Sequence, residues 1–326
     1  MSDTIKSKVI GVDVRVARTT LAVVDQRGNI LATDSFPTTD YPDVNNFLTM
    51  LSERIVMIAE NNGGFENIRS VGISAPSSNY MTGCIENAGN IPWKGIVPLA
   101  AMLRDRIGLA VALGNDAHIT ALGEHVYGAA HGMQNFLVAS LGHGGLGSCL
   151  FCNGIPHLGT NGSAGEMGHT CIVDGGRLCN CGSRGCLEAY VADKGIVQTA
   201  KEMMDETGQA TMMHEAKELS PKAIAECCEK GDELAIEVFR RTGEILGLGL
   251  ANVASILDPE AIILADEPTE VFKWLIGPTK DSFDRHVFHN IKDKVKLVVS
   301  ELKSDERDVL GAAALAWTVK EYSLFK

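Results

Sequence analysis

Three cysteines lie close together at the end of an irregular, glycine-rich stretch, and a histidine precedes them. The four residues are His169, Cys179, Cys181 and Cys186. Zinc in proteins prefers four soft or borderline ligands at the corners of a tetrahedron, and three thiolates with one imidazole meet that preference. Gly182 and Gly185 allow the backbone to turn tightly enough to bring Cys186 onto the ion. The spacing therefore predicts a zinc site that holds residues 153–186 in place.

Two other interpretations of this cluster remain open. The cysteines could be small buried residues of a tight loop, but three thiols at this spacing in a chain without a secretion signal favour a metal. A hydrolytic zinc site is disfavoured, because four protein ligands leave no position for an activated water. The other six of the nine cysteines are expected to be buried or incidental thiols.

Short apolar runs alternate with helical patterns along the rest of the chain. Strands are predicted at residues 9–14, 19–25, 30–36, 68–75, 109–113, 136–141, 147–151, 261–264 and 295–299. Helices are predicted at residues 43–61, 98–107 and 117–128, in most of 187–257, and at 309–322. This alternation indicates an α/β protein, and 326 residues are enough for two lobes with separate cores.

The charge balance narrows the classes of partner. Lys and Arg number 29 and Asp and Glu 41, which gives a formal net charge of −12. Extended binding to nucleic acid or to an anionic membrane needs clustered basic residues and is disfavoured. The most apolar helical stretch, residues 245–257, is too short to cross a bilayer. With no secretory leader evident, we expect a soluble cytoplasmic protein.

The segment from Gly165 to His169, together with the Cys-x-Cys-Gly-x-x-Gly-Cys-Leu-Glu run that ends at Glu188, closely resembles the signature of the ROK family. The resemblance extends to weaker motifs that occur in the family order. These are Gly114-Asn115-Asp116-Ala117, Ala121-Leu122-Gly123-Glu124, Leu257-Asp258-Pro259-Glu260 and Gly311-Ala312-Ala313. The ROK family contains sugar kinases, sugar-responsive repressors and related proteins.

Membership in this family implies an actin-like, ribonuclease H-like ATPase fold of two α/β lobes with a cleft between them. The small lobe is expected at residues 1–122 plus 305–326 and the large lobe at residues 123–304. A homodimer or higher homo-oligomer is expected as well. The family's repressors carry an N-terminal winged-helix domain, and a first strand near Val9 leaves no room for one here.

The resemblance also assigns the sugar side of the reaction. Asp116 matches the catalytic base that accepts a proton from the sugar hydroxyl, although an aspartate in this position is also a common helix N-cap. The predicted sugar ligands are Asn90, Asn115, Glu166, His169 and Glu188. His169 would give one ring nitrogen to zinc and the other to the sugar. Trp93 is expected to pack in the core rather than to stack on the sugar.

The nucleotide side departs from the family pattern. Family kinases open with Asp-x-Gly-Gly-Thr-Lys, where this chain has Asp13-Val14-Arg15-Val16-Ala17-Arg18. Side chains in place of glycine obstruct close approach of the backbone to phosphate. The second phosphate loop is partly kept as Gly142-His143-Gly144, and the third motif becomes Ala265-Asp266-Glu267. Asp13 would assist Mg²⁺, and Arg15 or Arg18 could replace the lost amide contacts with charge.

Two functions follow from these matches and departures. The first is an ATP- and Mg²⁺-dependent kinase for a hexose or an N-acetylhexosamine, with structural zinc. The second is a non-catalytic or regulatory sugar-binding protein that has lost efficient ATP binding. The nucleotide motifs are where the two hypotheses differ.

Overall fold

The computed structural model describes residues 6–89, 91–142, 145–265, 269–303 and 306–319. Within it the chain divides into two compact units, Met1–Gly132 with Glu301–Lys326, and Met133–Ser300. Boundaries were expected at residues 122 and 304. The first of these falls inside helix α3 (Asp116–Tyr127), which is continuous and belongs to the first unit. Helix α3 packs along α9 (Arg307–Thr318) of the same unit.

The first unit is built on a five-stranded sheet with the order β3-β2-β1-β4-β8. The strands are β1 (Lys8–Val14), β2 (Arg18–Asp25), β3 (Ile30–Pro37), β4 (Ile68–Ser74) and β8 (Ala110–Gly114). Strands β1, β2 and β3 form an antiparallel meander, whereas β4 and β8 run parallel to β1. Their alternating or continuous apolar residues predicted each of these strands to within about two residues.

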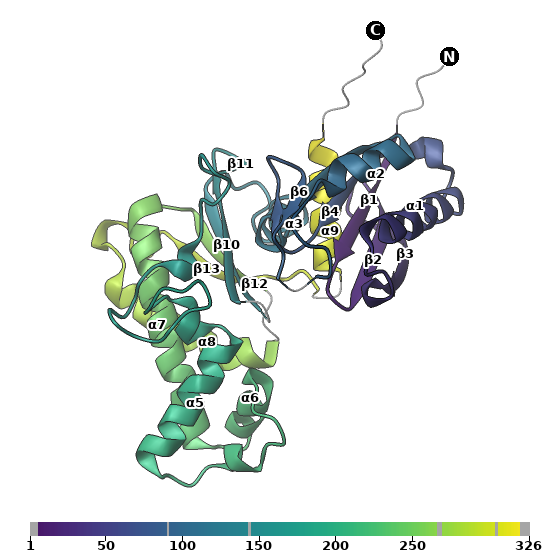
Figure 1. The fold of residues 1–326 in the computed structure, drawn as a ribbon. Coiled ribbons are helices and arrows are strands. Elements are labelled where there is room, and N and C mark those ends of the chain that lie inside the picture. Colours follow the sequence, from purple (N-terminus) through teal and green to yellow (C-terminus); the bar gives the residue numbers. More distant parts are fainter. Residues whose placement is uncertain (1–5, 90, 143–144, 266–268, 304–305, 320–326) are drawn as a thin grey trace. The chain divides into compact units, whose positions relative to one another are not determined.

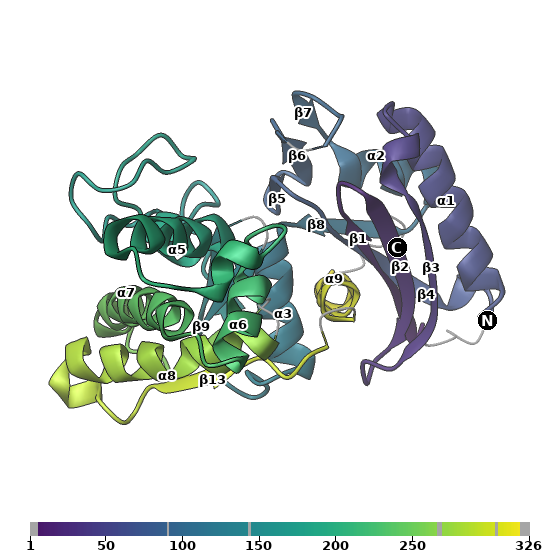
Figure 2. The same ribbon diagram turned by 90° about the horizontal axis from the view of Figure 1, so that it is seen from below.

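Helices cover both faces of this sheet. Helices α1 (Val44–Glu60) and α2 (Leu99–Ile107) enclose the larger core on one face, and α9 lies on the other (Figure 2). Asp43 caps α1 by accepting hydrogen bonds from the amides of Asn45 and Asn46. Trp93 is buried against Phe47 and donates its indole N–H to the Tyr41 carbonyl, so it packs as expected. A small sheet, not predicted from the sequence, joins β5 (Ser78–Asn79), β6 (Cys84–Glu86) and β7 (Ile96–Val97).

The second unit repeats the topology of the first. Its sheet has the order β11-β10-β9-β12-β13, in which β9, β10 and β11 form the antiparallel meander and β12 and β13 run parallel to β9. The strands are β9 (Phe136–Gly142), β10 (Gly145–Cys152), β11 (Ile155–Pro156), β12 (Ala261–Ala265) and β13 (Lys296–Val299). The two sheets therefore share one order and one set of strand directions.

Helices complete the second unit and its core. They are α4 (Glu188–Val191), α5 (Asp193–Thr207), α6 (Pro221–Glu229), α7 (Glu233–Leu257) and α8 (Thr269–His286). Helices α7 and α8 pack along each other (Figure 1). The sequence pattern predicted the helical region up to Leu257 but missed α8, which has the helix-breaking Pro278 in its interior. In the part of the chain described, no helix combines the length and apolarity needed to span a membrane.

Helix α9 approaches the first sheet closely because two strands carry glycine beneath it. A Cβ on Gly11 of β1 would overlap the carbonyl oxygen of Val309, and a Cβ on Gly72 of β4 would overlap that of Ala312. Both contacts are with backbone, which cannot move aside by changing a rotamer. The small side chains of the helix, including Ala313 and Ala316, are fully buried at this surface.

We expect Gly72→Ala to lower the free energy of unfolding by about 1–3 kcal/mol, because the added methyl group pushes α9 away from the sheet. Gly89→Ala is the matched control, since a Cβ there meets nothing within 4 Å. Urea unfolding of both variants measures the difference. Equal stability of the two variants would contradict the tight packing of α9.

His118 makes the stability of the first unit depend on pH. Burial lowers the pKa of His118 to about 4, and its ring lies edge-on to Tyr80. The unfolded chain takes up this proton near pH 6.5, so stability is lost as the pH falls from 6.5 to 4, by up to about 3 kcal/mol. Urea unfolding of wild type and His118→Gln across this range should show a steeper loss in wild type. Parallel curves would contradict the buried neutral imidazole.

Candidate functional site

Two predicted acidic residues meet at one edge of the first sheet. Strands β1, β4 and β8 are parallel, and Asp13 pairs with Ser74, which in turn pairs with Gly114. The carboxyl ends of these strands therefore lie together, and Asp116 follows β8 by two residues. In open α/β sheets the carboxyl ends of the strands are where ligands bind.

Asp116 is not the N-cap of α3. That role belongs to Asn115, whose side-chain oxygen accepts a hydrogen bond from the His118 amide at 2.8 Å. Asp116 is the first residue of the helix, and its side chain is 54% exposed. One carboxylate oxygen accepts from the adjacent Ala117 amide at 3.0 Å. The carboxylate is thus held at a helix N-terminus, where negative charge is favoured, and it remains accessible.

Arg15 lies in the hairpin between β1 and β2 and reaches back to this edge. Its Nε is 3.0 Å from Asp13 Oδ2, its Nη2 is 2.8 Å from Asp308 Oδ2, and its Nη1 is 3.8 Å from Asp116 Oδ2. Burial raises the pKa of Asp13 to about 6, against the opposing effect of the Arg15 charge. Arg18, the other arginine expected to bind nucleotide, instead donates to Ser35 Oγ at 2.6 Å. Asp308 was not among the residues predicted from the sequence, although it lies three residues before the Gly311 motif.

The cysteine and histidine side chains converge in the second unit. The ligand atoms of His169, Cys179, Cys181 and Cys186 all lie within 4.8 Å of one another. His169 Nδ1 is 3.7 Å from Cys179 Sγ, and Cys181 Sγ is 3.7 Å from Cys186 Sγ. A tetrahedron with Zn–S bonds of ~2.3 Å and Zn–N bonds of ~2.0–2.1 Å has S···S and S···N edges of ~3.8 and ~3.6 Å. The cluster therefore fits a zinc ion.

The backbone around this cluster turns at the two predicted glycines. Gly182 has φ +91° and Gly185 has φ +78°, a region that other residues rarely adopt. The Cys179 amide donates to the Ser183 carbonyl at 2.8 Å, and the Gly182 amide donates to the Cys179 carbonyl at 3.0 Å. These hydrogen bonds close a tight turn that carries Cys181. Both glycines therefore have the turn conformation that was expected of them.

The predicted sugar ligands of the second unit lie at or beside the cysteine cluster. His169 has its Nδ1 near Cys179, and its other ring nitrogen, Nε2, lies 4.0 Å from Glu166 Oε2. Glu188 accepts a hydrogen bond from the Leu146 amide at 3.0 Å, and its other oxygen is 3.7 Å from Cys179 Sγ. Glu188 thus links the cysteine loop to the β9–β10 hairpin.

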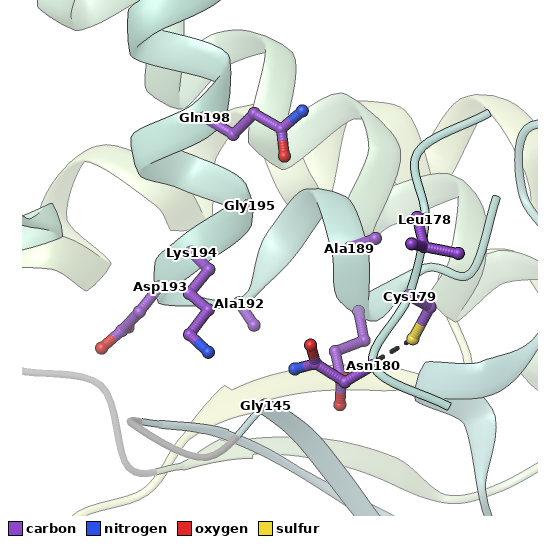
Figure 3. A pocket seen from close by; sticks show the side chains of 11 residues that line it. Gly145, Leu178, Cys179, Asn180, Ala189, Ala192, Asp193, Lys194, Gly195 and Gln198 are labelled. Carbon is purple, nitrogen blue, oxygen red and sulfur yellow. Dashed lines mark hydrogen bonds between the residues drawn. The ribbon is translucent and has the colours of Figure 1, made fainter. Parts of the chain in front are cut away.

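A pocket of about 230 Å³ opens beside this cluster. Cys179 and Asn180 line it from the cysteine loop, Gly145 from the β9–β10 hairpin, and Lys194 from the first turn of α5 (Figure 3). Glu188 also lines it. Neither Asn180 nor Lys194 was predicted from the sequence, because Asn180 is the variable position of the Cys-x-Cys motif and Lys194 lies outside the motifs.

The predicted residues therefore form two groups, one in each unit. Asp13, Arg15, Asn115 and Asp116 belong to the first group, and Glu166, His169, Glu188 and the three cysteines to the second. Gly142 ends β9, opposite Gly145 of β10. The predictions for Asn90, His143, Gly144, Asp266 and Glu267 concern positions outside the described residues.

Known proteins resemble this chain over almost its whole length. The chain is 30% identical to the glucokinase of Halalkalibacterium halodurans over 96% of this chain and 94% of that protein. A crystal structure of a ROK family glucokinase from Streptomyces griseus, in complex with glucose and AMPPNP, superimposes with a TM-score of 0.76 and 29% identity over 96% of this chain and all of that one.

A transcriptional regulator is also similar to this chain, but over a smaller part of its length. The DNA-binding transcriptional dual regulator NagC of Escherichia coli is 30% identical over 67% of this chain and 52% of NagC. The sequence pattern of the ROK family matches residues 9–319. This match, together with the actin-like ATPase fold that the chain shares with structures of ROK kinases, shows that the chain belongs to the ROK family.

Proposed function

We propose that this protein is a ROK sugar kinase that transfers the γ-phosphate of ATP to a hydroxyl of a hexose or N-acetylhexosamine. The observation that carries the proposal is the accessible Asp116 carboxylate at the carboxyl edge of the first sheet, in a chain similar to glucokinases over 96% of its length. A general base must be ionised and exposed to its substrate, and Asp116 meets the second condition because Asn115 performs the capping.

Each of the two groups contains proposed sugar ligands. Asn115 uses its side-chain oxygen for capping, so its amide nitrogen is the group that would donate to a sugar hydroxyl. His169 has its Nδ1 near Cys179 and its Nε2 near Glu166, so Nε2 and Glu166 are the groups that would bind the sugar. Glu188, also a proposed sugar ligand, is oriented by its bond from Leu146. Asn90 remains a sugar ligand proposed from the resemblance alone.

Zinc would be held by His169, Cys179, Cys181 and Cys186, whose spacing fits a tetrahedral ion. Bound zinc would cross-link the loop and fix the orientation of His169. Supporting residues that lock the rotamers of ligand-binding side chains make the geometry of a site more precise in this way.

The protein is also proposed to be a homodimer and to act in the cytoplasm, where ATP is present and thiols stay reduced.

ATP would bring Mg²⁺, which neutralises phosphate charge. The described residues around Asp13 do not fit this cation as they stand, because Arg15 occupies Asp13 Oδ2 and approaches two further carboxylates. The proposed nucleotide ligands are Gly142, His143 and Gly144. Arg15 and Arg18, the other two residues expected to bind nucleotide, are bonded to Asp13 and Ser35 instead.

The contacts of Arg15 favour a second candidate, a sugar-binding regulatory protein without efficient nucleotide binding. Calorimetry of the zinc-loaded protein with hexoses, and with ATP and Mg²⁺, separates the two. A heat of binding with both the sugar and the nucleotide, together with formation of sugar phosphate, supports the kinase. A heat of binding with the sugar alone supports the regulator, and displacement of a fluorescent ATP analogue checks that the nucleotide does not bind.

Asp116→Asn should lower kcat by about 10²–10⁴-fold, since a neutral amide cannot accept the hydroxyl proton. Affinity for the sugar, measured by calorimetry, should stay within about threefold, because the side chain keeps its shape. Asp105→Asn, an exposed aspartate of the same unit, is the control and should keep full activity. Retained turnover in Asp116→Asn would exclude Asp116 as the base.

Elemental analysis should find one zinc per chain, and Cys181→Ala should lose it because three ligands remain of four. Cys171→Ala is the matched control, as Cys171 is an exposed thiol of the same loop outside the four-residue cluster. Equal zinc content in the two variants would contradict the assignment of the ligands.

A further inference from the structure

The Arg15 guanidinium is surrounded by carboxylates from three places in the chain. Asp13 is the penultimate residue of β1, Asp116 begins α3, and Asp308 lies in the first turn of α9. Their oxygens are 3.0, 3.8 and 2.8 Å from the guanidinium nitrogens. All four residues belong to the first unit, so this charge cluster is formed within a single compact body.

The hairpin holds Arg15 in place for these contacts. The Arg15 amide donates to the Arg18 carbonyl at 3.0 Å, which closes the turn between β1 and β2. The Asp13 side chain is 10% exposed and that of Arg15 is 43% exposed, so the charge of Asp13 is neutralised mainly from within the protein. A guanidinium is always charged and can bond more than one carboxylate through its several donors.

The same carboxylates are the oxygen ligands that a divalent cation would use at this edge. Mg²⁺ prefers carboxylate oxygen and demands near-octahedral geometry. With Arg15 in place, a cation at Asp13 meets a like charge within a few ångströms, and it gains Oδ2 as a ligand only by displacing the bond from Nε. The cation and Arg15 therefore cannot both have full use of Asp13.

We propose that Arg15 is a built-in counter-ion of Asp13, Asp116 and Asp308 that competes with the divalent cation for these carboxylates. The consequence of this competition is that turnover requires a higher concentration of divalent cation, and this consequence rests on the proposed kinase function. The competition itself is a property of cation binding and is measured without turnover.

The test is Mn²⁺ binding to the zinc-loaded protein, with free Mn²⁺ counted by electron paramagnetic resonance. Arg15→Gly and Arg15→Gln should each bind Mn²⁺ at least tenfold more tightly than wild type. Arg18→Gly is the matched control, because it removes one positive charge from the same hairpin but from a side chain bonded to Ser35. The control should bind Mn²⁺ as wild type does.

The melting temperature gives a second readout in case the uncompensated carboxylates weaken the fold. Mg²⁺ should raise the Tm of the Arg15 variants and leave that of wild type and Arg18→Gly nearly unchanged. Unchanged or weaker Mn²⁺ affinity in both Arg15 variants overturns the proposal. So does a loss of ATP-analogue binding without tighter Mn²⁺ binding, which would make Arg15 a phosphate ligand.

Failure of the proposed kinase function gives a different result. In that case neither wild type nor the Arg15 variants form sugar phosphate at any Mg²⁺ concentration, while the Mn²⁺ affinities still differ as stated. The counter-ion role of Arg15 and the kinase reaction are thus judged by separate measurements.

Discussion

The packing of α9 onto the glycine-bearing strands β1 and β4 is the constraint on which the first unit depends. Gly11 and Gly72 are buried there, directly against the backbone of the helix. The packing also places the N-terminus of α9 near the carboxyl ends of the same strands. Asp308, almost 300 residues from Asp13 in sequence, reaches the Arg15 guanidinium for this reason. The stability of the unit and the electrostatics of its candidate site therefore share one cause.

The repeated sheet topology explains where the nucleotide motifs lie. The hairpin that contains Arg15 follows the first strand of the first sheet, and residues 142–145 form the corresponding connection after the first strand of the second sheet. Residue 265 ends β12, the strand that corresponds to β4. Two of the three altered motifs are thus related by the internal repeat. The connection in the first copy carries Arg15, whose guanidinium is a permanent positive charge.

Much of the cysteine cluster could be predicted from the sequence, because its ligands and its two glycines are local. Residues 179–186 form one short segment of the loop. Cysteines spaced this closely can be recognised as metal ligands without knowing which distant residues lie near them. The strands were predicted for a similar reason, since each apolar run reports its own burial. The helix α8 was missed because Pro278 and the polar surface obscured its periodicity, and its packing against α7 outweighs both.

The sequence by itself determined the family, the α/β class and the identity of the chemical groups: which residues carry thiolate, imidazole, carboxylate and guanidinium. Only the tertiary structure decided how those groups are used. It gave the N-cap of α3 to Asn115 and left Asp116 accessible. It also turned Arg15 from an expected phosphate ligand into a partner of three carboxylates. The physical reason is that charge interactions depend on distance in space, and the distances between β1, α3 and α9 are set by packing between segments that are remote in the chain.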